Sequence, residues 1–114
     1  MNTASLPEAE LQRSHDFVMA SLFALRGTHD HKLIPIVLEQ YAAGGEAVLP
    51  SHSLAARFGT SRRTICAARR RLVDAGFIRR VRVNDMRQNV YVPCLERADE
   101  YRAHLSAVEQ RDAA

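Results

Sequence analysis

A chain of 114 residues with 46% hydrophobic composition is long enough for one core and too short for two, which predicts a single small domain. No apolar run approaches the roughly 18 residues of a membrane span, and the N-terminus lacks a basic stretch followed by an apolar core. We therefore expect a cytoplasmic protein without membrane contact. Two cysteines are too few for a disulfide framework or a metal site by themselves.

The formal net charge of +3 is unevenly distributed. Ten arginines and two aspartates lie between Arg57 and Arg87, a balance of +8, whereas residues 1–56 carry −3 and residues 95–114 carry −2. A basic centre between mildly acidic ends is typical of nucleic-acid binding. The alternative is a solvated charged face, which for the isolated arginine triplet 69–71 explains the charge equally well.

Residues 1–28 are predicted to contain a helix. Ser5 and Glu8 fit a capping box, Pro7 is allowed in the first turn, and Gly27 can end the helix. Its apolar line follows four-three spacing and comprises Leu11, Val18, Leu22 and Leu25, with His15 interrupting it. Phe17 and Phe23 add apolar surface beside this line. This helix either covers the core or pairs with a partner chain.

The next helix is predicted within residues 28–45. Pro35 lacks an amide, so the helix should begin near His31 to Leu33, where that amide needs no partner. Four residues at helical spacing form its apolar stripe: Ile34, Val37, Leu38 and Tyr41. Two glycines then lead into a short strand at 47–49, which we expect to pair with a later hairpin in a three-stranded sheet.

His29, Asp30 and His31 suggest a metal site. Three consecutive residues at a helix start do not converge easily on one ion, so we expect no metal and no cofactor. Cys66 could act as a redox switch, but the simpler interpretation is a small neutral residue tolerated at its position.

Two short helices follow, joined by a tight turn. In the first, Ser51 is the expected cap, Gly59 the end, and the buried stripe comprises Leu54, Ala55 and Phe58. The second should run from Arg62 to Ala75, with Ser61 as its cap and Gly76 ending it. At about 100° per residue, its apolar face and its polar face separate. The apolar face holds Ile65, Ala68 and Leu72, and the polar face holds Arg62, Arg63, Cys66, Ala67 and Arg70.

A hairpin is predicted next, from strand-forming residues at 77–83 and 89–92 with a tip at 84–88. The tip has no glycine, which leaves its turn type open. Arginines in such a hairpin could hold DNA phosphates or enter the minor groove. After Pro93 a weakly amphipathic helix is expected from Leu95 to Gln110, followed by a frayed tail.

Four motifs carry a family resemblance: the Leu-Pro-Ser opening at Leu49, Leu-Ala-x-x-Phe-Gly, Ser-Arg-x-Thr-Ile, and Leu-x-x-x-Gly-Phe-Ile ending at Ile78. This run resembles the winged helix of GntR-type bacterial regulators. It is also similar to winged-helix modules of phage and plasmid replication proteins, which share the Pro-Ser opening and often end in a strand like Asn89 to Tyr91. The resemblance covers about half the chain and implies DNA binding by a winged helix-turn-helix.

By this resemblance Arg62 contacts a base, and Ser51, Arg63 and Thr64 contact the DNA backbone. The sequence departs from the GntR pattern at Cys66, where a second base-reading arginine is common, and at Arg69, where a leucine is usually buried. The operator preference of the GntR-type regulators therefore does not carry over, and we expect Arg70 to contribute to base recognition. The full expected DNA-binding set is Ser51, Ser61, Arg62, Arg63, Thr64, Cys66, Arg70, Arg79, Arg80, Arg82 and Arg87.

The predicted fold is mainly α with a small β-hairpin wing, an α+β winged helix-turn-helix at 29–93 flanked by helices in 1–28 and 94–114. We find no nucleophile turn and no glycine-rich phosphate cradle, so we do not expect an enzyme. We also expect no separate effector domain and no small-molecule ligand.

Three functions fit these expectations. The preferred one is a sequence-specific transcriptional regulator on double-stranded DNA, working as a homodimer through its terminal helices. The others are a plasmid or phage replication or partition accessory protein, and a winged helix used for protein contacts.

Overall fold

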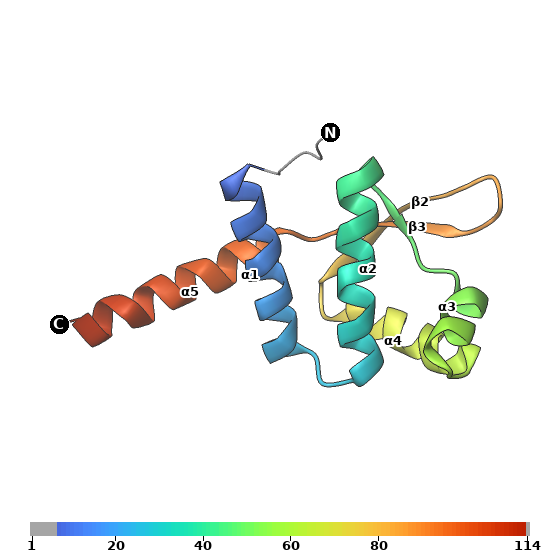
Figure 1. Cartoon of the computed structure of the whole chain (residues 1–114), viewed down its shortest axis with the longest axis horizontal. Coiled ribbons are helices and arrows are strands. Elements are labelled where there is room, and N and C mark those ends of the chain that lie inside the picture. The colour runs from blue at the N-terminus through green and yellow to red at the C-terminus, as the bar shows by residue number, and fades with distance from the viewer. Residues whose placement is uncertain (1–6, 114) are drawn as a thin grey trace.

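Five helices and three strands make up the part of the chain that the computed structural model describes, residues 7–113 (Figure 1). In chain order they are α1 (Glu8–Ala24), α2 (Thr28–Gly44), β1 (Ala47–Val48), α3 (Ser51–Phe58), α4 (Arg62–Asp74), β2 (Ile78–Val83), β3 (Asn89–Pro93) and α5 (Glu96–Ala113). The strands form one antiparallel sheet in the order β1-β3-β2. This mainly helical chain with a small sheet confirms the predicted α+β class and the pairing of the short first strand with the hairpin.

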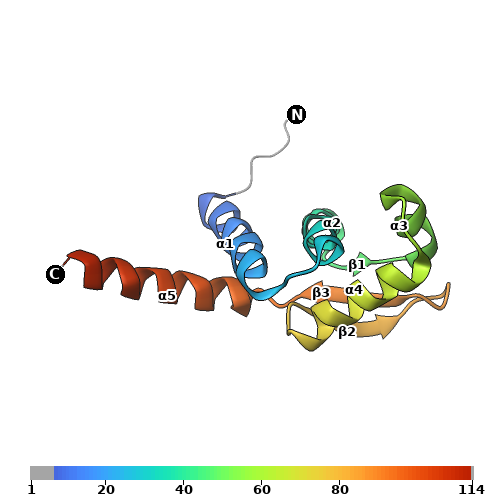
Figure 2. The same ribbon diagram turned by 90° about the horizontal axis from the view of Figure 1, so that it is seen from below.

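The elements are arranged as a body with two projections in opposite directions. α2 packs on α4 and on the sheet, and α3 packs on α4. Figures 1 and 2 show the β2–β3 hairpin leaving the body on one side and α5 leaving it on the other. Within residues 7–113, α5 packs against α1 and against no other helix or strand. No described helix is both long enough and apolar enough to cross a membrane.

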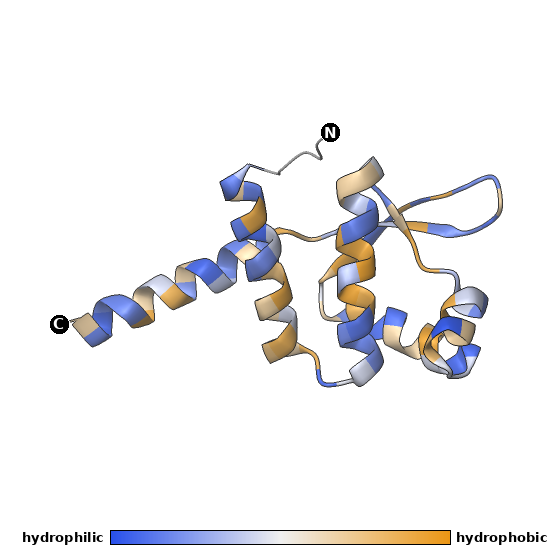
Figure 3. Ribbon diagram, in the orientation of Figure 1, coloured by the Kyte–Doolittle hydropathy of each residue, from blue (hydrophilic) through white to orange (hydrophobic). Residues whose placement is uncertain are grey.

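The core forms where α2, α4 and the start of the hairpin meet. Ile34 and Val37 of α2 and Ile65, Ala68 and Leu72 of α4 are buried at the helical spacing expected for them. The predicted stripe of α2 was wrong in part, because Leu38 is half-buried, Tyr41 is 37% exposed, and Leu33 is buried instead. Phe17 of α1 meets Phe77 edge to face, with ring centroids 5.4 Å apart. Figure 3 shows the apolar residues concentrated on α2 and the end of α1, whereas hydrophilic and hydrophobic residues alternate along α5. Burying each large apolar side chain contributes roughly 1.5–3 kcal/mol to folding.

Most of the predicted signals around α3 and α4 are confirmed. The Ser61 hydroxyl accepts a hydrogen bond from the Thr64 amide at 3.1 Å, and Gly59 and Gly76 adopt positive φ values of 64° and 77° after the two helices. Ser51, however, is the first residue of α3 and makes no side-chain capping bond. Pro50 takes the flanking position instead, because its carbonyl accepts the first helical hydrogen bond, from Leu54.

The prediction for the first helix was wrong in two respects. α1 ends at Ala24 and not at Gly27, because the extended backbone of Leu25 turns that side chain into the core. Leu11 and Leu22, expected in the apolar line, are 52% and 48% exposed. α1 packs on both α2 and α5, which places Asp16, Phe17 and Ser21 in its buried face instead. Ser5, half of the expected capping box, lies outside the described residues.

α2 begins at Thr28, earlier than Pro35 led us to expect. Asp30 lies in the first turn, and Arg71 of α4 binds its carboxylate, which holds this turn against the body. Pro35 therefore lies inside the helix on its exposed side, where its missing amide removes one backbone hydrogen bond.

α5 is also longer than predicted. It continues to Ala113, so that Arg111, placed in a frayed tail by the sequence, is helical. Two ion pairs dock its first half on α1: Arg102 with Asp16 and Arg13 with Asp99, each at 2.7 Å.

Candidate nucleic-acid interface

The exposed face of α4 carries the polar residues predicted for it. Its opposite face is fully buried in the core through Ile65, Ala68 and Leu72. The outward residues share a single side of the helix and are all exposed: Arg62, Arg63, Cys66, Ala67 and Arg70. Because α4 rises about 1.5 Å per residue, the first and last arginines of this stripe lie roughly 12 Å apart along the helix axis. Two small side chains between them leave space for a close approach by another molecule.

The N-terminus of α4 presents amides and cations together. Ser61 caps the helix, and its hydroxyl lies 2.9 Å from that of Thr64. The first turn contains no acidic residue and carries Arg62 and Arg63. A helix N-terminus is the positive end of the helix dipole, so the local charge of this turn favours an anion such as a phosphate.

The arginine triplet is divided between the fold and the surface. Arg69 donates to the Leu49 carbonyl at 2.7 Å, and to Cys66 Sγ at 3.5 Å. The hydrogen bonds from Arg71 to the Asp30 carboxylate raise the pKa of this arginine. Within the described residues, the Arg70 guanidinium forms no intramolecular hydrogen bond, which leaves it available to a ligand.

A hollow of about 670 Å³ separates α4 from β3. Its walls include Cys66 and Arg70 of the α4 stripe and, from the hairpin, Asn89 and Tyr91. The stripe is thus continuous with the first residues of β3.

A second hollow, of about 280 Å³, connects α3 with the hairpin tip. Ser51, His52, Arg69 and Arg87 all line it. It brings together Ser51 and Arg87, which the sequence assigned to one interface although 36 positions separate them. Sequence reasoning did not single out His52, because an exposed histidine in a short polar helix gives no signal of its own.

The four arginines of the hairpin do not share one face. Arg80 pairs with Tyr91 and Arg82 pairs with Val90, and a bulge at Val81 separates these pairs. Directly opposed residues of antiparallel strands lie on the same face, and Tyr91 and Val90, as neighbours, lie on opposite faces. Arg80 therefore shares the face of Tyr91, which borders α4, whereas Arg82 lies on the reverse face.

Arg82 is also bound within the chain. Its guanidinium lies 2.7 Å from the carboxylate of Glu46, next to β1, and this ion pair lowers the pKa of Glu46. Arg79 pairs with Val92 and falls on the same reverse face. The structure thus places Arg80 on the sheet face that borders α4 and Arg87 in one hollow with Arg69, whereas Arg79 and Arg82 lie on the reverse face.

Hydrogen bonds from Asn84 organise the hairpin tip. Its side-chain oxygen accepts from the amides of Met86 and Gln88, both at 2.9 Å, and its side-chain nitrogen donates to the Gln88 side chain. Arg87 adopts a left-handed conformation with φ of 61°. The sequence left this turn open because it lacks a glycine, and the arginine occupies the position that a glycine commonly takes.

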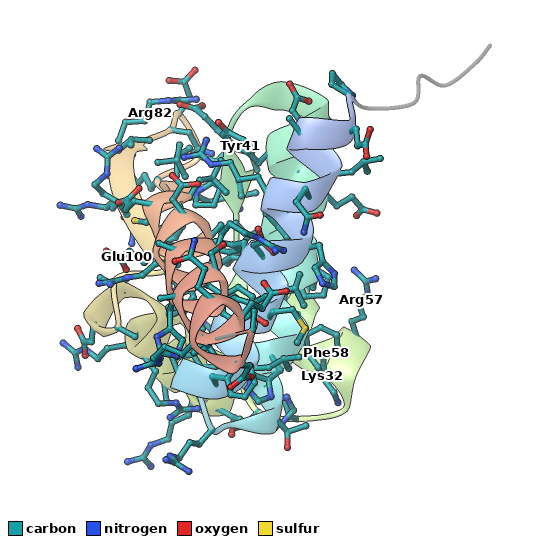
Figure 4. All side chains as sticks on the ribbon, turned by 90° about the vertical axis from the view of Figure 1, so that its left-hand side faces the viewer. Lys32, Tyr41, Arg57, Phe58, Arg82 and Glu100 are labelled. Atoms are coloured by element: carbon teal, nitrogen blue, oxygen red, sulfur yellow. The ribbon has the colours of Figure 1, made fainter. Side chains whose placement is uncertain are left out.

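A further cationic cluster surrounds the Phe58 ring of α3 and includes a side chain from α2. Lys32 Nζ and the Arg57 guanidinium carbon lie 5.4 and 5.9 Å from the centroid of the Phe58 ring. Figure 4 shows these three side chains together at one end of the molecule. Lys32 belongs to an acidic segment of the sequence, so composition gave no reason to group it with the basic centre.

The residues of the suspected metal cluster point to different partners. Arg71 binds Asp30, His31 Nε2 donates to the Leu25 carbonyl at 2.6 Å, and the His29 ring stacks on Phe58. Among residues 7–113 no group of three or more histidines, cysteines, aspartates and glutamates could hold a metal ion. Both cysteines are free, with Cys66 exposed on the α4 stripe.

No protein-family model matches the chain, and no curated protein is significantly similar to it.

Proposed function

We propose that this chain is a winged helix-turn-helix protein that binds double-stranded DNA and regulates transcription at specific sites. In this proposal α4 enters the major groove, α3 braces it, and the β2–β3 hairpin is the wing. The exposed stripe of α4 carries the proposal, because arginines flank two small residues there and the opposite face is buried.

Each cationic residue has a role in this proposal. Arg62 and Arg70 read base edges, since an arginine matches the two acceptors of guanine. Arg63, Thr64 and Ser51 hold phosphates at either side of the groove, and Arg80 and Arg87 extend these contacts from the wing. Arg69 and Arg71 support the domain from within.

Selection of bound duplexes from a random pool tests the proposal. The purified chain should enrich one motif at near-physiological salt, and its affinity should fall steeply with salt, by about 0.9 in log–log slope per phosphate contacted. Arg62→Ala should cost about 1–3 kcal/mol of binding and relax the motif at one position. If no motif is enriched and Arg62→Ala has no effect, the domain is a protein-contact module or a non-specific binder.

The same interface could serve a replication or partition accessory protein of a plasmid or phage. The location of the enriched motif separates the two functions. A motif repeated within a replication origin indicates the accessory role, whereas a motif overlapping a promoter indicates a regulator.

A further inference from the structure

An apolar groove lies between the end of α1 and the middle of α5, away from the hairpin. It encloses about 720 Å³, and its apolar lining includes Phe23 of α1, Phe77, and three residues of α5: Tyr101, Leu105 and Val108. We call it the α1–α5 groove. Phe23 is 72% exposed, although its ring stacks on Tyr101 with centroids 6.2 Å apart. A large apolar surface rimmed by polar residues is typical of an interaction site.

One side of α5 forms one wall of this groove. Tyr101, Leu105 and Val108 follow the i, i+4, i+7 spacing of one helix side. α5 packs on α1 and on no other described element, and Figure 2 shows its C-terminal half projecting beyond the body. The apolar row of α5 therefore extends along the groove, and beyond α1 no other described element covers it.

We propose that the α1–α5 groove is closed by α5 of a second copy of this chain, in an antiparallel arrangement with twofold symmetry. In such a symmetric dimer the same surface of each copy forms the interface. The apolar row of one copy therefore lines its own groove and packs into the groove of the other copy.

The charges beside the apolar row favour this occupant. Glu100 and Arg111 are eleven residues apart, which at about 100° per residue places them within roughly 20° of each other around the helix. If two antiparallel α5 helices meet midway between Leu105 and Ser106, Glu100 of each copy lies opposite Arg111 of the other. A parallel pair in register would instead hold Glu100 of one copy and Arg111 of the other roughly 16 Å apart along the helix axis, too far to pair.

Both charges are available for this pairing. The Glu100 side chain is 62% exposed and pairs locally with Arg97, and within the described residues Arg111 forms no ion pair. Residues 95–114 carry a net charge of −2, which disfavours DNA as the occupant of this surface.

The mass of the purified chain in solution, measured by light scattering without DNA, tests the proposal. At micromolar concentration the wild type should weigh twice the 12.8 kDa of one chain. Val108→Asp places an unpaired charge in the apolar row and should weaken the dimer by at least about tenfold. Ala103→Asp is the matched control, because Ala103 is exposed on the side of α5 opposite the apolar row and its substitution should leave the mass unchanged.

Charge reversal examines the antiparallel register. Glu100→Arg alone and Arg111→Glu alone should each favour the monomer, and the double variant should restore the dimer. Circular dichroism of each variant checks that the fold is kept. A monomeric wild type, a dimer unaffected by Val108→Asp, or equal losses in Val108→Asp and Ala103→Asp would each overturn the proposal. Because the readout is mass without DNA, it is independent of whether α4 binds DNA.

Discussion

Arg71 of α4 holds the buried carboxylate of Asp30 of α2 through three hydrogen bonds of 2.7–3.0 Å. The Asp30 side chain is 1% exposed, whereas that of Arg71 is 50% exposed. The pair therefore links the proposed recognition helix to α2 through a carboxylate that is shielded from solvent. The side chain of the preceding residue, Arg70, makes no hydrogen bond within residues 7–113.

Removal of Arg71 should destabilise the fold. Arg71→Ala leaves the Asp30 carboxylate buried without its cation, and we expect a loss of about 2 kcal/mol in the free energy of unfolding, below the usual cost of breaking a buried pair because Arg71 is half exposed. Urea denaturation measures the effect. Arg70→Ala is the control and should stay within about 0.5 kcal/mol of the wild type. Equal stability of the two variants would mean that the Asp30 contact contributes nothing.

The contrast within the arginine triplet shows what sequence periodicity predicts and what it does not. The 3.6-residue period placed Ile65, Ala68 and Leu72 correctly in the core, because a helix with one apolar stripe has one way to bury it. The same period could not show that Arg69 would reach the Leu49 carbonyl. That contact depends on where β1 ends in space, and β1 is distant in the sequence.

The hairpin also has a part that local sequence predicts and a part that it does not. Strand-forming residues predicted both strands and their polar loop, because those preferences are local. The bulge at Val81 reverses the expected alternation and separates Arg80 from Arg82. A bulge depends on the register of two strands, so the charge pattern alone suggested one cationic wing.

The stabilisation that Asp16 provides where α5 docks on α1 should be lost at acid pH. Hydrogen bonds from Arg102 hold the pKa of this carboxyl below its ordinary value of 3.8, against the opposing effect of burial. Because the pKa is lowered in the folded state, the stabilisation is fully present above about pH 4 and is lost as the pH falls through the folded-state pKa.

Asp16→Asn tests this dependence. The variant should be less stable than the wild type at pH 7, and the difference should shrink as the pH falls toward 3, as measured by urea denaturation at each pH. Asp74→Asn, at an exposed aspartate, should follow the wild-type curve. A constant difference between Asp16→Asn and the wild type across this range would exclude the ionised carboxylate as the source of the stabilisation.

The hairpin tip should loosen when the Asn84 side chain is removed. Asn84→Ala deletes the acceptor of the Met86 and Gln88 amides, and their hydrogen exchange, followed by NMR, should become faster. The global free energy of unfolding should fall by no more than about 1 kcal/mol, because the loop is exposed. Asp85→Ala, whose side chain is exposed at the same tip, should leave both amides protected.

Arg70 and Arg82 should differ in their effect on DNA binding, although composition treats them alike. Arg70 lies on the exposed stripe of α4, whereas Arg82 lies on the reverse face of the sheet and is held by Glu46. Measured by fluorescence anisotropy on the selected duplex, Arg70→Ala should cost about 1–3 kcal/mol of binding free energy and alter the preferred sequence. Arg82→Ala should change the affinity by less than about 0.5 kcal/mol. Each variant removes one positive charge, so equal losses would show that net charge governs binding and that α4 does not read the bases.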